Sequence, residues 1–199
     1  MTYIVILNAV VYVMEMLFPQ SNLYTKLALD PAMVVRGEVW RLITFLFLPP
    51  SASPIFIVFT LYFYYLVGSN LENQWGSFRF NLYYLIGVIC TIAASFISYG
   101  ISGYGTVGPE HLNLSLFLAF AYLFPYFEVL LFFFIPIKVK YLAWANWIFI
   151  VISLIINPLP VKLAAIASVV NYFIFFGTDL FTTIKLRIQT YKNRKRFRD

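Results

Sequence analysis

The chain alternates between long apolar stretches and short polar or proline-rich segments, a pattern that predicts a set of membrane-spanning helices. A span needs about 20 apolar residues, within a range of roughly 17–25. Proline ends several of the stretches, notably at Pro19 and Pro125, because it cannot continue a helix. We expect six spans, over residues 3–18, 55–73, 80–99, 111–124, 139–156 and 161–178.

Two parts of this pattern depart from an ordinary span. A helix over 111–124 would be only about 21 Å long, whereas the hydrocarbon core is about 30 Å thick. The alternative is one longer helix over 111–135, kinked at Pro125, which leaves the number of spans at six. Residues 19–53 are too polar to cross and too apolar to float free, so we expect this first connection to lie partly submerged in one leaflet.

Composition supports an integral membrane protein with one all-α domain over residues 1–184. Of the 199 residues, 62% are hydrophobic and only 11% are charged, and the mean hydropathy is +0.83. The first apolar segment has no basic leader, so we expect a retained helix. The single cysteine, Cys90, and the single histidine exclude a disulfide framework and make a zinc site improbable, because such sites need at least three protein ligands. We expect no metal and no cofactor.

Positive charge is unevenly distributed along the chain. Six spans put both termini on one side, and the tail 185–199 carries seven of the fourteen Lys and Arg residues. Cytoplasmic loops are enriched in these residues, so both termini are expected to be cytoplasmic. Ten basic residues then lie inside, including Arg79, Lys138 and Lys140, against four outside. The basic tail is expected to lie near anionic membrane lipids, and no nucleic acid is expected as a partner.

Several polar residues stand within or beside the apolar stretches. Trp40 and Arg41 adjoin at the start of an apolar run in the first connection, as in a loop anchored at the membrane interface. Glu72 lies near the end of the second span, either at the interface or paired with Arg79 or with backbone amides. Other polar residues are expected to form hydrogen bonds between helices, worth about 0.6 kcal/mol each. They are Asn113, Ser115, Asn146, Asn171 and Thr178.

Three segments together resemble the rhomboid superfamily, in the right order along the chain. GEVWRLITFLFLP resembles the Trp-Arg motif of the first rhomboid loop, and YYLVGSNLENQWGSFRF resembles the end of rhomboid helix 2. FAYLFPYFEVLLFFFIPIKVKYLAW resembles the passage from helix 4 to helix 5. The resemblance implies a six-helix bundle with a membrane-embedded first loop. Within it, Glu72, with Trp75, Gly76 and Arg79 after it, belongs to the helix 2 motif that holds the structure, and Trp40 and Arg41 stabilise the loop.

The catalytic residues of rhomboid proteases do not align with this chain. In the family, the serine of Gly-x-Ser-Gly begins helix 4, and a histidine of helix 6 takes its proton. Here Ser102 lies about eight residues too early, and the family's serine position falls near Glu110 and His111. The position of the histidine falls near Ala165. An alternative remains, in which His111 serves Ser102 or Ser115, the latter one helical turn away.

The resemblance therefore implies a catalytically inactive, derlin-like pseudoprotease. Such a protein would bind transmembrane client proteins in membrane protein quality control, with lateral access between helices 2 and 5 and local bilayer thinning. The alternatives are an active intramembrane serine protease with a non-standard site, or a small lipid or solute carrier, although the chain has no internal repeat. The passage from helix 4 to helix 5 favours the bacterial inner membrane, with the endoplasmic reticulum as the alternative.

Overall fold

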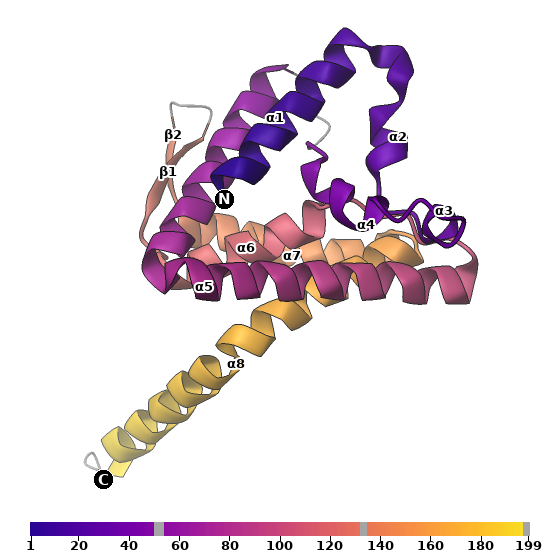
Figure 1. The fold of residues 1–199 in the computed structure, drawn as a ribbon. Coiled ribbons are helices and arrows are strands. Elements are labelled where there is room, and N and C mark those ends of the chain that lie inside the picture. Colours follow the sequence, from indigo (N-terminus) through magenta and orange to yellow (C-terminus); the bar gives the residue numbers. More distant parts are fainter. Residues whose placement is uncertain (50–53, 132–134, 197–199) are drawn as a thin grey trace.

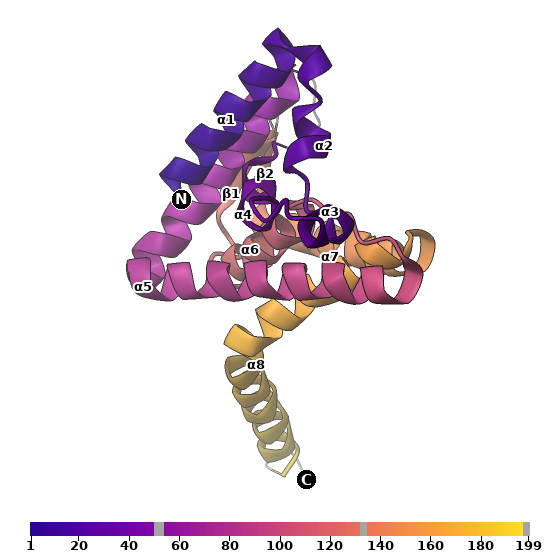
Figure 2. The ribbon, with the colours of Figure 1, turned by 45° about the vertical axis from the view of Figure 1, so that its right-hand side comes forward.

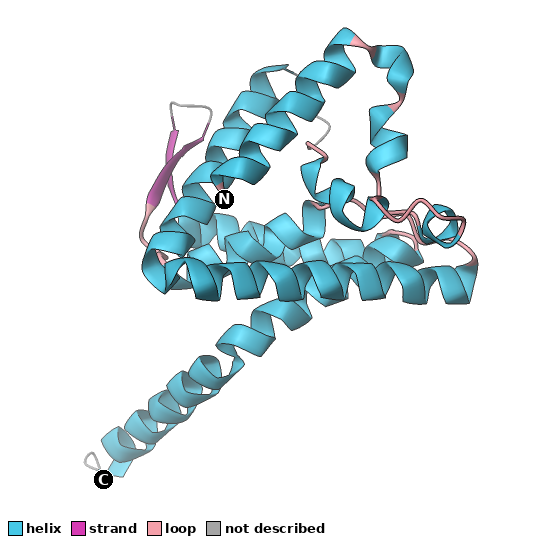
Figure 3. Cartoon of the chain, in the orientation of Figure 1, coloured by secondary structure: helices cyan, strands magenta, loops and turns pink. Residues whose placement is uncertain are grey.

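The chain folds mostly into helices of very unequal length (Figure 1, Figure 3). The computed structural model describes residues 1–49, 54–131 and 135–196. The longer helices are α1 (Thr2–Leu17), α5 (Pro54–Ser102), α6 (Glu110–Leu123), α7 (Val139–Ile156) and α8 (Leu159–Arg196). The first connection holds η1 (Pro19–Ser21), α2 (Leu23–Leu27), α3 (Pro31–Val35), α4 (Arg41–Thr44) and η2 (Phe45–Phe47).

Two groups of helices meet at the bend of α5. The N-terminal arm of α5 runs beside α1, and its C-terminal arm belongs to a group with α6 and the first part of α8, on which α7 packs (Figure 1, Figure 2). The rest of α8 leaves this second group and projects away toward the C-terminus. Of the short helices of the first connection, α3 lies against α5, whereas η1, α2 and η2 contact α1.

The bend of α5 is produced by a single residue, Gly76. Its backbone has φ 78° and ψ 156°, a conformation that is almost restricted to glycine, and the chain on both sides of it is helical. The sequence predicts two spans, 55–73 and 80–99, with a polar hinge between them, and the bend at Gly76 confirms a change of direction in that segment, although residues such as Glu72 and Gln74 stay helical. One glycine is enough to redirect the chain.

Three helices of the described chain are long and apolar enough to cross a membrane, over Phe56–Ser102, Val139–Ile156 and Leu159–Gly177. The bend at Gly76 divides the first into two arms. α1 has 16 residues and α6 has 14, so both are shorter than an ordinary span. These helices coincide with the six predicted segments, and the number of crossings stays a prediction. The predicted boundary between residues 184 and 185 falls inside α8, which continues to Arg196.

A β-hairpin follows α6 in a chain that is otherwise helical, as predicted, and the sequence did not predict this hairpin. The strands β1 (Glu128–Leu131) and β2 (Ile135–Lys138) pair antiparallel, with Glu128 opposite Lys138. Pro125 ends the helix, and the β-branched residues that follow favour extended backbone. The longer helix over 111–135 considered from the sequence is therefore wrong. The tip of the hairpin, residues 132–134, lies outside the described residues.

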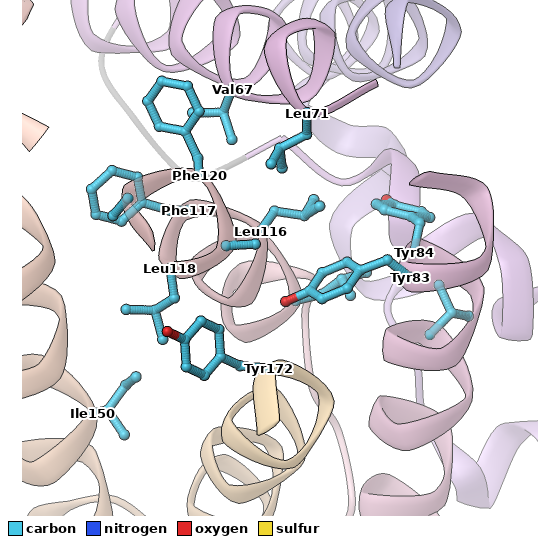
Figure 4. Packing of buried hydrophobic residues seen from close by; sticks show 14 of the residues in the cluster. Val67, Leu71, Tyr83, Tyr84, Leu116, Phe117, Leu118, Phe120, Ile150 and Tyr172 are labelled. Carbon is cyan, nitrogen blue, oxygen red and sulfur yellow. The ribbon is translucent and has the colours of Figure 1, made fainter. Parts of the chain in front are cut away.

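The core is centred on α6, which other helices surround. Nine of its 14 residues are buried, and Leu116 and Phe120 are almost completely buried. Figure 4 shows these side chains packed between Val67 and Leu71 of the N-terminal arm of α5, Tyr83 of its C-terminal arm, and α7 and α8. By contrast, α1, α5 and α7 expose many large apolar side chains, as surfaces that face lipid do.

Candidate functional site

The Gly-Ile-Ser-Gly segment forms the C-terminal end of α5. Ser102 is the last helical residue, and its hydroxyl is shared between the carbonyl oxygens of Ser98 (2.9 Å) and Tyr104 (3.0 Å). Gly103 follows with φ 70°, and its N–H donates to the carbonyl of Tyr99 at 2.8 Å. A glycine of this conformation commonly ends a helix. The serine and glycine are thus accounted for by helix termination.

Ser115 joins three helices in the centre of the protein. It is fully buried in α6, and its Oγ lies 2.6 Å from Tyr83 Oη of α5. It also accepts a hydrogen bond from Asn171 Nδ2 of α8 at 3.2 Å. Interhelical bonding was predicted for Ser115 and Asn171, and the two bonds confirm it. The Ser115 hydroxyl is therefore occupied by residues of two neighbouring helices.

His111 lies one turn before Ser115 and is 7% exposed. Its Nε2 is buried, and within the described residues it has no hydrogen-bond partner. In the same part of the chain, no hydrogen bond joins His111 to Ser115 or to Ser102. A general base has to reach the proton that it abstracts at about 2.6–3.2 Å, so this arrangement does not form a Ser–His pair.

The other two residues of the expected active-site region have structural surroundings. Glu110 is exposed in the first turn of α6, and its carboxylate covers Gly108, where an added Cβ would come within 2.3 Å of Oε2. Ala165 of α8 is fully buried, and its carbonyl accepts a hydrogen bond from Ser168 Oγ at 2.7 Å. A methyl group in the core therefore occupies the position at which the sequence comparison expected a base.

Arg41 joins several parts of the first connection through its hydrogen bonds. Its side chain is buried, and Nη1 donates to the carbonyls of Thr25 (2.5 Å) and Ala28 (3.0 Å) at the end of α2. Nε donates to Glu38 Oε2 at 2.6 Å. The guanidinium thus binds main chain on one side and a carboxylate on the other. Trp40, next to it, is 52% exposed, which suits a side chain that meets lipid headgroups.

Two further side chains form hydrogen bonds between separate parts of the first connection. Thr44 Oγ1 donates to the carbonyl of Leu27 at 3.1 Å, and the hydroxyl of Tyr24 donates to the carbonyl of Pro49. Burial, followed by the charges of Glu110 and Glu15, raises the pKa of Tyr24 to about 12, so this hydroxyl keeps its proton at neutral pH. The connection is thereby held as an ordered unit and not as a flexible loop.

Glu72 is attached to the bend of α5. Its Oε1 accepts a hydrogen bond from Ser77 Oγ at 3.0 Å, across Gly76, and Oε2 accepts one from the Met1 amino group at 3.2 Å. The partner suggested by the sequence, Arg79, is exposed, and in the described chain it forms no ion pair with Glu72. Trp75 packs inward, with its ring centre 5.6 Å from that of Phe176 in α8.

A cavity of about 410 Å³ separates the N-terminal arm of α5 from α7. Phe59 and Phe63 form one wall, and Phe149 lies on the opposite wall. The full lining is Phe59, Phe63, Leu114, Phe117, Val129, Leu142, Ala145, Asn146 and Phe149. The lining therefore comes from two helices that expose apolar side chains to the surroundings, together with Leu114 and Phe117 of α6 and Val129 of β1.

Comparison with protein families decides what these elements belong to. The family model described as the Rhomboid domain matches residues 36–176, which is more than half of the chain. The protein belongs to the rhomboid family. A comparison with curated proteins finds no match. The rhomboid domain thus runs from the end of α3 to Phe176 in α8, and it includes Arg41, the bend of α5 and every residue that lines the cavity.

Sequence reasoning missed how this rhomboid domain connects its polar residues. It did not identify Tyr83 as the partner of Ser115, or the cavity position of Asn146. The available signal was that buried polar groups are nearly always paired, but the sequence does not say with which partner. Among the described residues of the rhomboid domain and its flanks, no three His, Cys, Asp or Glu side chains could hold a metal ion.

Proposed function

We propose that this rhomboid-family protein is a pseudoprotease that binds transmembrane segments of other membrane proteins without cleaving them. The cavity between α5 and α7 carries the proposal. It lies between the helices that correspond to the second and fifth predicted spans, where lateral access was expected. A client helix would approach through the lipid and place side chains of one face into the cavity.

The physical driving force for such binding is packing. Lipid tails are as apolar as leucine, so helices associate in a membrane through van der Waals contact and interhelical hydrogen bonds. A cavity of about 410 Å³ leaves room for side chains of a client, which would add van der Waals contacts with its walls. The aromatic walls supply large contact areas for this purpose.

The absence of cleavage is proposed from the surroundings of the serines and the histidine. A serine hydroxyl needs a base that accepts its proton. The hydroxyl of Ser102 instead bonds two carbonyl oxygens, which cannot accept a proton at neutral pH. Ser115 is bonded to Tyr83 and Asn171, and the only histidine of the chain, His111, contacts neither serine by a hydrogen bond in the described part.

The proposal also includes how the protein lies in the membrane and in which membrane it lies. The basic end of α8 and the positive-inside rule favour cytoplasmic termini, and the resemblance to bacterial rhomboids favours the bacterial inner membrane. α6, with 14 residues, is about 21 Å long, shorter than the ~30 Å hydrocarbon core. Thinning of the bilayer around it would assist polar client segments.

The test measures how tightly the protein binds a defined single-span Leu-Ala peptide in liposomes. Energy transfer between a dye on the peptide and a dye on the protein reports the binding. Ala145→Trp fills the cavity, and Ile152→Trp adds the same side chain to α7 at a residue outside the cavity lining. Binding that Ala145→Trp abolishes and Ile152→Trp preserves supports the proposal. Equal binding by wild type and both variants, or no binding by wild type, contradicts it.

A further inference from the structure

A second cavity, of about 420 Å³, lies on another face of α7. Its α7 residues are 140, 143, 144 and 147, whereas those of the cavity toward α5 are 142, 145, 146 and 149. The two sets are offset by two positions, which correspond to about 200° around a helix. The second cavity is therefore on nearly the opposite face of α7 and is separate from the cavity proposed for client binding. It is lined by Ala121, Lys140, Ala143, Trp144 and Trp147.

The second cavity has a basic end and an aromatic length. Lys140 is the second residue of α7, and Trp147 lies about 10 Å further along the helix at about 1.5 Å rise per residue. Trp144 stands between them and is 71% exposed. The ring of Trp147 packs on α8, with its centre 6.1 Å from that of Tyr172 and 6.5 Å from that of Phe173. A ligand of this cavity would therefore contact a positive charge at one end and indole rings along the rest.

The Lys140 amine is held in place without a counter-ion. It lies 4.9 Å from the ring centre of Tyr141 and 5.5 Å from that of Tyr126, which are cation–π distances. Among the described residues, none of the ion pairs includes Lys140. Both tyrosines are exposed, so their hydroxyls can donate to a ligand that reaches the amine. These groups together suit an anion with several oxygen atoms.

We propose that this cavity binds an anionic phospholipid. The phosphate pairs with the Lys140 amine, and an acyl chain lies along Trp144 and Trp147, over the small side chains of Ala121 and Ala143. A phospholipid carries its charge at the membrane boundary and its apolar chains further in. The cavity has the same order, because Lys140 is at the end of a helix that is apolar and long enough to cross a membrane. This inference goes beyond client binding and does not depend on it.

Other occupants match the cavity less well. A transmembrane segment of a protein would cover the two tryptophans, but it would need a carboxylate at the level of Lys140 to pair with the amine. A zwitterionic phospholipid has the phosphate, but its own cationic group cancels that charge. Attraction between one lysine near a membrane surface and anionic lipid corresponds to about a fivefold preference, which is the preference expected here.

The experiment uses phospholipids with brominated acyl chains, which quench indole fluorescence on contact. Brominated phosphatidylglycerol, which is anionic, is compared with brominated phosphatidylcholine, which is zwitterionic, in mixed liposomes. All proteins carry Trp40→Phe, because Trp40 is exposed elsewhere. Trp75 packs inward against Phe176, so the quenching reports on Trp144 and Trp147. The dependence of quenching on lipid fraction gives the relative affinity for the two lipids.

The variants separate a built site from general surface charge. Lys140→Gln removes the charge of the cavity. Lys138→Gln is the matched control, since Lys138 is two residues away and exposed, pairs with Glu128 at 4.0 Å and does not line the cavity. Ala143→Leu fills the cavity without adding an indole. Each variant is checked for normal thermal unfolding, and the two lysine variants keep the test decisive if Ala143→Leu does not fold.

We expect the parent protein and Lys138→Gln to prefer phosphatidylglycerol about fivefold. Lys140→Gln should show a ratio near one, and Ala143→Leu should lower the ratio as well. A ratio near one in the parent protein, or a ratio that Lys140→Gln or Ala143→Leu leaves unchanged, overturns the inference. Equal loss in both lysine variants would identify general surface charge as the cause and also overturns it. So does a lack of quenching by either lipid, which would mean that a protein partner, such as a second copy, covers this face.

Discussion

The hydroxyl groups of Tyr83 and Ser115 lie 2.6 Å apart in the interior, and they join the C-terminal arm of α5 to α6. Asn171 of α8 adds a third helix to the same hydroxyl. In the largely apolar interior, these bonds help to fix how the three helices are rotated against one another, because a different rotation would break bonds between buried polar groups. The serine nearest to His111 therefore has a structural role.

Replacing Tyr83 by Phe removes its hydroxyl while keeping the ring that packs on Trp75 and Phe175. The hydroxyl bonds both the carbonyl and the Oγ of Ser115, so we expect the free energy of unfolding to fall by about 1–3 kcal/mol, the cost of leaving buried polar groups unsatisfied. Reversible unfolding in detergent micelles measures the change. Tyr65→Phe, at an exposed position on α5, is the control and should have little effect. Equal stability of the two variants would show that the Tyr83 hydroxyl contributes nothing.

Gly76 should tolerate no side chain, because its φ of 78° and ψ of 156° are strained for any other residue. We expect Gly76→Ala to lower the free energy of unfolding by about 1–3 kcal/mol. Gly100→Ala is the control: Gly100 is also in α5, without positive φ and with open space around its Cβ position. There alanine should stabilise the helix by up to about 1 kcal/mol. If both variants changed stability in the same direction, the bend would not depend on the glycine conformation.

The sequence predicted correctly the features that depend on the chemistry of a single residue or of one short segment. Long apolar runs predicted the helices, and Pro125 was expected to end the fourth segment at residue 124, one residue beyond the observed end at Leu123. The membrane-protein class and the rhomboid family followed from hydropathy and from three short motifs, and the family match over residues 36–176 confirms the family. These features are local, so they can be read without knowing the neighbours of a residue.

Features that depend on contacts between distant segments were missed. The hinge after Glu72 was predicted correctly from its polar residues, but the sequence did not show that they stay helical and that only Gly76 departs from the helix. The hairpin was missed because β1 and β2 are stabilised by pairing with each other, which no single segment reveals. Similarly, the cavity arises from the spacing of α5 and α7, and hydropathy says nothing about that spacing.

Arg41→Lys tests whether the first connection depends on the shape of the guanidinium and not only on its charge. A lysine amine cannot reach the carbonyls of Thr25 and Ala28 and the carboxylate of Glu38 together. We expect a loss of about 2 kcal/mol in the free energy of unfolding, with faster proteolysis between α1 and α5. Arg36→Lys, at an exposed position of the same connection, should change neither. Matching behaviour of the two variants would contradict the role of Arg41.

The proposed lack of catalysis can be tested with a fluorophosphonate probe, which labels activated serines. Because Ser102 bonds only carbonyl oxygens and Ser115 is held by Tyr83 and Asn171, we expect no labelling of the protein in detergent or in liposomes. An active rhomboid protease, treated alongside, is the positive control. Labelling that disappears in Ser102→Ala or in Ser115→Ala would identify that serine as a nucleophile. His111→Ala would then show whether the histidine activates it, and the protein would be an intramembrane protease with an unusual site.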